Sequence, residues 1–131
     1  MYLLDTDTCV EILRGNDRVI ARRRAVYAPV WTTEITASEL FYGAAKSREP
    51  SANRQVVLDF LRTLEVLPIS LAGAQFFGGL KAQLQADGQN IPDADLWIAS
   101  ISRAVRAKIV TGNTRHLARV PGVECEDWIR G

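Results

Sequence analysis

Short apolar segments alternate with amphipathic helical segments along the chain, and this alternation is the strongest constraint on its fold. The strand-like segments are rich in β-branched and aromatic residues, and we expect them at residues 2–4, 29–35, 65–69, 108–111 and 123–128. Strand–helix–strand units form parallel sheets with helices on their faces. The sequence therefore predicts an α/β protein, a three-layer α/β/α sandwich with a mainly parallel central sheet of four to five strands.

Capping residues predict where the helices begin. Thr8 with Glu11, and Thr36 with Glu39, each place a hydroxyl and a glutamate three residues apart, which is the capping-box pattern. We therefore expect Glu39 in the first turn of its helix. The helix that begins at Pro92 is apolar on almost every side, which is typical of a buried helix.

Length and composition indicate one domain. The chain has 131 residues, of which 47% are hydrophobic, enough for a single core spanning residues 1–131. Cys9 and Cys125 lack the spacing of a zinc site and are too few for a disulfide framework, so a reducing compartment fits best. No signal peptide opens the chain, and no run reaches the ~18 apolar residues of a membrane span. We expect a cytoplasmic protein with no membrane segment.

The charge distribution is more informative than its sum. A formal charge of +1 gives no overall attraction to nucleic acid. Five arginines stand against one acid between residues 14 and 24, among them Arg14, Arg22, Arg23 and Arg24. Such a patch is able to hold RNA phosphates. A solvated helix face, or a surface that pairs with an acidic partner, explains it equally well.

Several acidic residues are expected near the carboxyl edge of the sheet. Asp5 directly follows the first apolar strand, where a carboxylate is costly unless it is exposed, paired or metal-bound. Asp93 and Asp95 fall in the first turn of the buried helix, where one cap suffices, and Asp95 is the better functional candidate because it precedes the apolar run. Each of these residues also admits a capping explanation, as do Glu39 and Asp7.

The acids are more informative together than singly. In α/β folds ligands bind at the carboxyl ends of the strands, where Asp5, Glu39 and Asp95 are expected to meet. Carboxylates without a His or Cys cluster form a hard oxygen site that suits Mg²⁺, or Mn²⁺ in its place. A metal there allows a phosphodiester to bind and activates water for in-line attack. We therefore predict a metal-dependent hydrolase that acts on phosphoesters.

Four short motifs follow one another along the chain. They are Leu-Leu-Asp-Thr-Asp at residues 3–7, Ser-Glu-Leu-x-Tyr-Gly at 38–43, Ile-Pro-Asp-Ala-Asp-x-x-Ile-Ala at 91–99 and Ile-Val-Thr-Gly-Asn-Thr-Arg at 109–115. In this order and spacing they resemble PIN-domain ribonucleases, above all the VapC or FitB-like toxins of prokaryotic type II toxin–antitoxin pairs. The resemblance extends from about residue 2 to residue 128.

This resemblance implies an Mg²⁺- or Mn²⁺-dependent endoribonuclease that cuts single-stranded RNA or RNA loops and leaves 5′-phosphate and 3′-hydroxyl ends. The metal-binding and catalytic acids would be Asp5, Glu39 and Asp95, with Asp93 as a neighbouring metal ligand. Hydrogen-bonding support would come from Thr6, Thr111 and Asn113. The resemblance also implies a cognate antitoxin whose tail enters the active site, a homodimer, and a toxin–antitoxin hetero-oligomer.

Two positions depart from the family pattern. Asp7 stands where relatives often have asparagine, and it either adds a carboxylate or keeps the turn. His116 stands where many relatives carry a fourth acid, which bears on a second metal site; a neutral imidazole is able to hold a metal or a phosphate, but a lone surface histidine is more often structural. Apolar residues are candidates for dimer or antitoxin surfaces, although core packing explains them as well: Leu58, Phe76 and Phe77.

Two rival functions remain open at this stage. Residues 5–8 also resemble the D-x-D-x-T start of haloacid dehalogenase-like phosphatases, with Asp5 as nucleophile and Asp7 as general acid/base. That reading leaves residues 38–40 unexplained, and 131 residues is short for such a fold. The second rival is a catalytically inactive module that binds RNA or an antitoxin. An RNA cleavage assay with the substitution Asp5→Asn distinguishes these readings.

Overall fold

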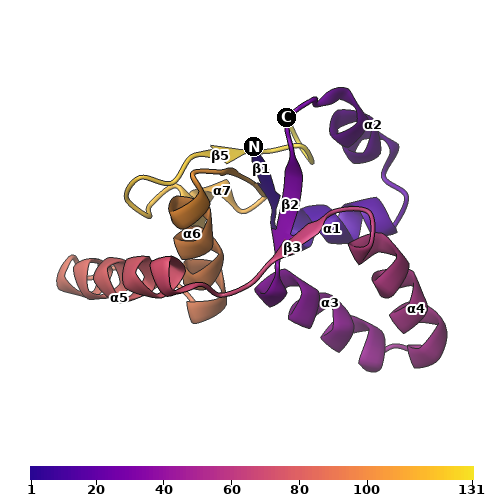
Figure 1. The fold of residues 1–131 in the computed structure, drawn as a ribbon, viewed down its shortest axis with the longest axis horizontal. Helices are drawn as coiled ribbons and strands as arrows, with labels where there is room; N and C mark the ends of the chain where they lie inside the picture. Colours follow the sequence, from indigo (N-terminus) through magenta and orange to yellow (C-terminus); the bar gives the residue numbers. More distant parts are fainter.

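The structure is a computed structural model that describes all 131 residues. Strands and helices alternate along most of the chain (Figure 1). The elements are β1 (Tyr2–Leu4), α1 (Thr6–Leu13), α2 (Asp17–Ala25), β2 (Val30–Thr33), α3 (Glu34–Ala45), α4 (Pro50–Leu61), β3 (Glu65–Leu67), α5 (Leu71–Ala86), α6 (Asp93–Val105), β4 (Lys108–Val110), α7 (Thr114–Leu117) and β5 (Cys125–Glu126). All five predicted strands are present, although four of them are shorter than the sequence indicated.

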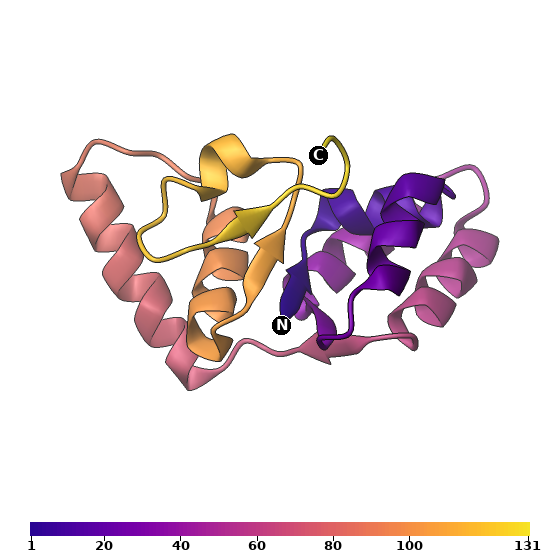
Figure 2. The ribbon, with the colours of Figure 1, turned by 90° about the horizontal axis from the view of Figure 1, so that it is seen from above.

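The five strands form one sheet in the order β3-β2-β1-β4-β5, and every pairing is parallel. Figure 2 shows α5 and α6 on one side of the sheet and α1 to α4 on the other. The predicted three-layer α/β/α sandwich is therefore confirmed. Because the strands are parallel, their carboxyl ends all meet at one edge. Strand β1 lies at the centre, between β2 and β4.

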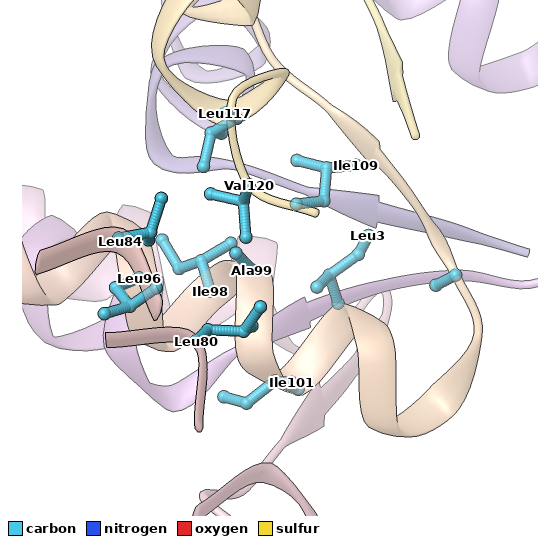
Figure 3. Close-up of a cluster of buried hydrophobic side chains, with 11 residues drawn as sticks. Leu3, Leu80, Leu84, Leu96, Ile98, Ala99, Ile101, Ile109, Leu117 and Val120 are labelled. Atoms are coloured by element: carbon cyan, nitrogen blue, oxygen red, sulfur yellow. The ribbon is translucent and has the colours of Figure 1, made fainter. Parts of the chain in front are cut away.

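Two hydrophobic clusters fill the spaces between the sheet and its helices. Successive side chains of a strand point to opposite faces, so Leu3 joins one cluster and Leu4 the other. The first cluster, drawn in Figure 3, brings Leu80 of α5 and Ile98 of α6 against the strands. The second includes Trp128, which is fully buried although it lies near the chain end. These clusters fix α6 and the C-terminal segment relative to the strand ends.

Both predicted capping boxes are wrong. Asp5 caps α1 by accepting a hydrogen bond from the Thr6 amide at 2.8 Å, so the helix begins at Thr6. Thr33 caps α3 by accepting from the Thr36 amide at 3.1 Å, which places Glu39 beyond the first turn. In each case the strand leads into the helix with almost no loop, so the cap comes from the residue at the strand end.

The phenylalanines of α5 are not exposed, contrary to the surface role considered for them. Phe77 stacks on Trp97 with a centroid distance of 4.1 Å, and Phe76 packs against the first cluster; Leu58 is half-buried. The exposed large apolar side chains are Met1, Tyr27, Tyr42, Val56, Ile69 and Leu71. No helix has both the length and the apolar character needed to cross a membrane.

Candidate active site

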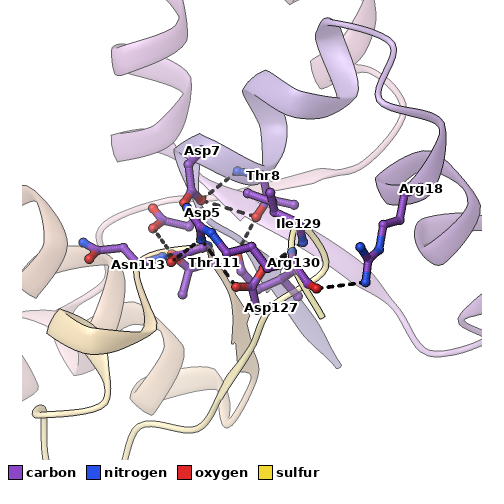
Figure 4. A network of polar contacts seen from close by, with 11 residues as sticks. Asp5, Asp7, Thr8, Arg18, Thr111, Asn113, Asp127, Ile129 and Arg130 are labelled. Carbon is purple, nitrogen blue, oxygen red and sulfur yellow. Dashed lines mark hydrogen bonds and ion pairs between the residues drawn. The ribbon is translucent and has the colours of Figure 1, made fainter.

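Asp5 occupies the centre of the carboxyl edge. It follows β1, and its amide donates to the Val110 carbonyl at the end of the neighbouring β4 at 2.9 Å. The Thr111 hydroxyl donates to Asp5 Oδ2 at 2.8 Å, and the Thr6 amide donates to Oδ1 at 2.8 Å (Figure 4). The residue is only 6% exposed. Both carboxylate oxygens therefore have a fixed orientation.

Burial makes the charged form of Asp5 costly. Desolvation raises the pKa of Asp5 from 3.8 to about 6, the hydrogen bonds from Thr111 and Thr6 oppose the rise, and the charges of Asp7 and Asp95 add to it. No ion pair in the structure includes Asp5. A cation beside this carboxylate would offset both the desolvation and the repulsion from neighbouring acids.

Glu39 approaches the same edge from α3. Its Oε1 accepts a hydrogen bond from the Thr6 hydroxyl at 2.7 Å, and that hydroxyl is also hydrogen-bonded to the Thr36 hydroxyl at 3.1 Å. Thr6 directly follows Asp5, so it connects the α3 acid to the end of β1. The Glu39 side chain is itself exposed and has no ion-pair partner.

Asp95 approaches from the first turn of α6. Its pKa is raised by burial first, then by the charges of Glu39 and Asp7, while His116 lowers it. The charges of Glu39, Asp7 and His116 therefore all act on Asp95. Asp95 has no ion-pair partner either. The edge thus gathers acids from β1, α1, α3 and α6 without a compensating salt bridge.

Asp93 and His116 occupy less central positions. Asp93 is exposed and accepts hydrogen bonds from Lys81 Nζ at 3.1 and 3.4 Å, so a cation of α5 already neutralises it. His116 is exposed on α7, with its Nδ1 3.4 Å from Asn113 Nδ2. Asn113 also donates its amide to the Thr111 hydroxyl at 2.9 Å, so it supports the residue that orients Asp5.

Asp7 keeps a turn, which was one of the two roles left open for it. Its Oδ1 accepts from the Thr8 amide at 2.7 Å, and its Oδ2 accepts from the Gly112 amide at 2.8 Å. Asp7 therefore ties the β1–α1 junction to the loop after β4. These two backbone contacts occupy one lone pair on each oxygen.

The donor set fits a hard divalent cation. No three His, Cys, Asp or Glu side chains lie close enough together to form a preformed metal site. The acids that converge on the edge are oxygen donors, as Mg²⁺ and Mn²⁺ prefer. Burial and the charges of neighbouring acids raise the pKa values of Asp5 and Asp95, so a cation there would stabilise their charged forms.

The four arginines considered for RNA binding are not gathered into one patch. Arg14 lines a pocket of about 400 Å³ that also includes Thr6 and Glu39. Arg22 instead forms an ion pair with Glu126 at 2.6 Å, and Arg23 donates to the Thr63 carbonyl and hydroxyl. Arg24 lines a separate pocket beside α4. Of the four, only Arg14 lines a pocket together with an acid of the site.

The C-terminal segment contributes to the site in a way that was not predicted from the sequence. Asp127 follows β5 at the same sheet edge, and Arg130 donates to the Gly112 carbonyl at 2.9 Å. The predicted strand at 123–128 placed Asp127 inside a strand, whereas β5 ends at Glu126 and Asp127 directly follows it. An acid directly after a strand was the available signal, as it had been for Asp5.

Comparison with known proteins agrees with this geometry. The PIN domain family model matches residues 2–123. Ribonuclease VapC2 of Haemophilus influenzae is 32% identical over 129 residues, which cover 98% of each chain. The tRNA(fMet)-specific endonuclease VapC of Salmonella typhimurium is 34% identical over 128 residues, which cover 97% of each chain.

A solved structure extends the likeness to three dimensions. The crystal structure of DNA-bound VapBC from Salmonella typhimurium superposes with a TM-score of 0.92 at 33% identity, covering 97% of each chain. The likeness in fold therefore extends over nearly the whole chain. The chain belongs to the PIN-domain family and, within it, to the VapC ribonucleases.

Proposed function

We propose that this protein is a metal-dependent endoribonuclease and the toxin of a type II toxin–antitoxin pair. One observation carries the proposal. Asp5 is buried at the carboxyl edge of a parallel sheet, its pKa is raised to about 6, and no cationic side chain pairs with it or with the acids beside it. Such an arrangement favours a bound divalent cation over a purely structural role.

In this proposal Asp5, Glu39 and Asp95 hold Mg²⁺ or Mn²⁺. A divalent cation held there supplies Lewis-acid stabilisation of phosphate charge and lowers the pKa of coordinated water. Thr111 orients Asp5 Oδ2, and Thr6 orients Glu39 Oε1, through the hydrogen bonds described above. Asp93 stands outside the proposed ligand set, because Lys81 neutralises its charge.

Substrate binding needs positive charge near these acids. Arg14 lies at the pocket that includes Glu39, which makes it the arginine best placed to contact a phosphate next to the scissile bond. His116 lowers the pKa of Asp95, and its imidazole is able to hydrogen-bond a phosphate oxygen. Relatives of this chain are named tRNA(fMet)-specific endonucleases, so a tRNA is the first substrate to test.

The partners follow from the same relatives. One related solved structure is described as a member of the VapBC family of toxin–antitoxin systems, and we propose that this chain binds a cognate antitoxin of its own. We also propose that it forms a homodimer. Copurification with the product of an adjacent small open reading frame, followed by light scattering of each species, tests both proposals.

The phosphatase alternative gives Asp7 the role of general acid/base. Both Asp7 oxygens accept backbone amides, and one of them fixes a loop 105 residues away. Asp7 thus already has a structural role, and the match of the PIN domain family model to residues 2–123 disfavours a phosphatase.

The decisive experiment is RNA cleavage by the purified chain, freed of antitoxin. We expect cleavage of RNA, including a tRNA transcript, with Mg²⁺ or Mn²⁺, and none in EDTA or with Asp5→Asn. Asp59→Asn, an exposed acid on α4, is the matched control and should cleave normally. Absence of cleavage by the wild-type chain with either metal, on every RNA tested, would support an inactive binding module. Phosphate release from small esters, with a phosphoryl group trapped on Asp5, would support the phosphatase.

A further inference from the structure

Gly112 is held through both its amide and its carbonyl by charged side chains from opposite ends of the sequence. Its amide donates to Asp7 Oδ2 at 2.8 Å, and its carbonyl accepts from Arg130 Nη1 at 2.9 Å. Hydrogen bonds to charged groups are about twice as strong as those between neutral groups. We call this arrangement, made of Asp7, Gly112 and Arg130, the glycine clamp.

The clamp is tightly packed around Gly112. A Cβ at this position would lie 2.8 Å from Arg130 Nη1, 2.9 Å from Asp7 Oδ2 and 3.1 Å from Ile129 Cδ1. The first two distances are shorter than real Cβ contacts, so a side chain here would displace the ends of the Arg130 and Asp7 side chains that make the clamp.

Arg130 is held in place by its own surroundings. Its amide donates to Asp127 Oδ1 at 3.0 Å, its guanidinium lies 3.5 Å from Asp127 Oδ2, and its carbonyl accepts from Arg18 at 2.9 Å. Figure 4 draws Asp127 and Arg130 in the same polar network as Asp5, with Arg18 reaching this network from the side. The C-terminal turn is thus a fixed support for the loop after β4.

The residues on both sides of Gly112 orient the central acid. Thr111 donates to Asp5 Oδ2 at 2.8 Å, and the Asn113 amide donates to the same Thr111 hydroxyl at 2.9 Å. Because the Thr111 hydroxyl oxygen accepts from the Asn113 backbone amide, the hydroxyl proton is directed toward Asp5 Oδ2. A rotation of the backbone at Gly112 would move the Thr111 hydroxyl and the Asn113 backbone amide. The clamp therefore controls the orientation of Asp5.

We propose that Asp7 and Arg130 are positioning residues of the ribonuclease site, acting through Gly112 and Thr111 on Asp5. The inference rests on the proposed function, because it assigns Asp5 to the metal site. It makes the C-terminal turn part of the active-site support. It also explains a carboxylate at position 7: an Asn there has one acceptor oxygen, whereas Asp7 accepts from two amides.

Arg130→Gln is the main test, with Arg62→Gln as its matched control. Both arginines have side chains that are 71% exposed, and both pair with an aspartate three residues earlier. Only Arg130 also contacts the loop after β4. An exposed ion pair by itself contributes little. Any difference between the two variants at the metal site therefore reports the clamp.

Mn²⁺ affinity in the absence of RNA, measured by titration calorimetry, is the first readout. Residues that orient metal ligands typically contribute about 10- to 100-fold to metal affinity or activity. We expect Arg130→Gln and Asp7→Asn each to weaken Mn²⁺ binding about tenfold, with Arg62→Gln unchanged. At saturating Mn²⁺ we expect kcat for RNA to fall with KM little changed. Arg130→Lys, which retains one charged donor, should recover part of the loss.

The double variant tests whether both residues act on one peptide. If they do, the loss of Mn²⁺ affinity in the double variant Asp7→Asn with Arg130→Gln should be smaller than the product of the two single losses. The reason is that the first substitution already frees Gly112 from the clamp, so the second has less to remove. Multiplicative losses would refute the common route through Gly112. Equal Mn²⁺ affinities for Arg130→Gln and Arg62→Gln would overturn the clamp even if the wild-type chain cleaves RNA. Conversely, wild-type protein that binds Mn²⁺ but cleaves no RNA would refute the proposed function alone.

Discussion

Replacing Asp5 by asparagine should stabilise the metal-free protein at neutral pH while it abolishes activity. Burial raises the pKa of Asp5 from 3.8 to about 6. The ionised carboxylate is therefore less stable in the folded protein than in the unfolded chain. The stabilisation that comes from protonated Asp5 is fully present below pH 3.8 and is lost as the pH rises through about 6. Above that pH the ionised side chain destabilises the fold.

The size of the effect follows from the pKa. Since one pKa unit corresponds to about 1.4 kcal/mol, ionised Asp5 costs the metal-free protein roughly 3 kcal/mol above pH 6. For a domain of this size that corresponds to a shift in Tm of roughly 10 °C. This is an upper bound, because an asparagine side chain accepts through one oxygen and leaves either the Thr6 amide or the Thr111 hydroxyl without its present acceptor.

Thermal unfolding in EDTA, followed by circular dichroism between pH 4 and 8, measures this directly. The Tm of Asp5→Asn should exceed that of the wild type at pH 7.5, and the difference should shrink as the pH falls toward 4. Asp59→Asn is the control, since Asp59 is exposed. Mg²⁺ should raise the Tm of the wild type and leave Asp5→Asn unchanged, because a ligand stabilises only the state that binds it. A Tm of Asp5→Asn equal to or below that of the wild type at pH 7.5 would refute the reasoning.

Three further substitutions test the surroundings of Asp5. Thr111→Val removes the hydroxyl that donates to Asp5 while keeping a side chain of similar shape. RNA cleavage in a gel assay should therefore fall about 10- to 100-fold. Undiminished cleavage would show that Thr111 does not orient Asp5 for the reaction. Gly112→Ala places a methyl group within 3.1 Å of three side chains, and urea unfolding should show a loss of about 1–3 kcal/mol; an unchanged midpoint would mean that the neighbours yield freely. Asp93→Asn breaks only the exposed pair with Lys81, so Mn²⁺ affinity should stay the same, and a loss comparable to that of Glu39→Gln would return Asp93 to the ligand set.

The candidate acids were recognised from sequence with uneven success. Asp5 and Asp95 could be predicted because each adjoins an apolar run, and such runs reveal the end of a buried strand or the start of a buried helix. Glu39 was identified for a mixed reason. Its family motif pointed to the site, but its supposed capping position was wrong, since Thr33 at the strand end supplies the cap.

Phosphate-binding residues were harder to predict. Local charge density alone suggested four arginines, yet Arg22 and Arg23 have partners in β5 and in the turn after α4. A run of like charges along a helix projects in several directions, and sequence alone does not tell which side faces the site. Only Arg14, which directly follows α1, lines a pocket together with Glu39.

The sequence by itself determined the layered α/β architecture, the parallel sheet and the placement of Asp5 at its carboxyl edge. These features depend on periodicity and on what directly follows an apolar run, which are local properties of the chain. Only the tertiary structure decided that Asp7 holds a turn, that Lys81 neutralises Asp93, and that Arg130 supports the loop carrying Thr111. Those contacts join residues 12 to 105 positions apart. They depend on which strands and helices become neighbours, and that order is set by packing of the whole core.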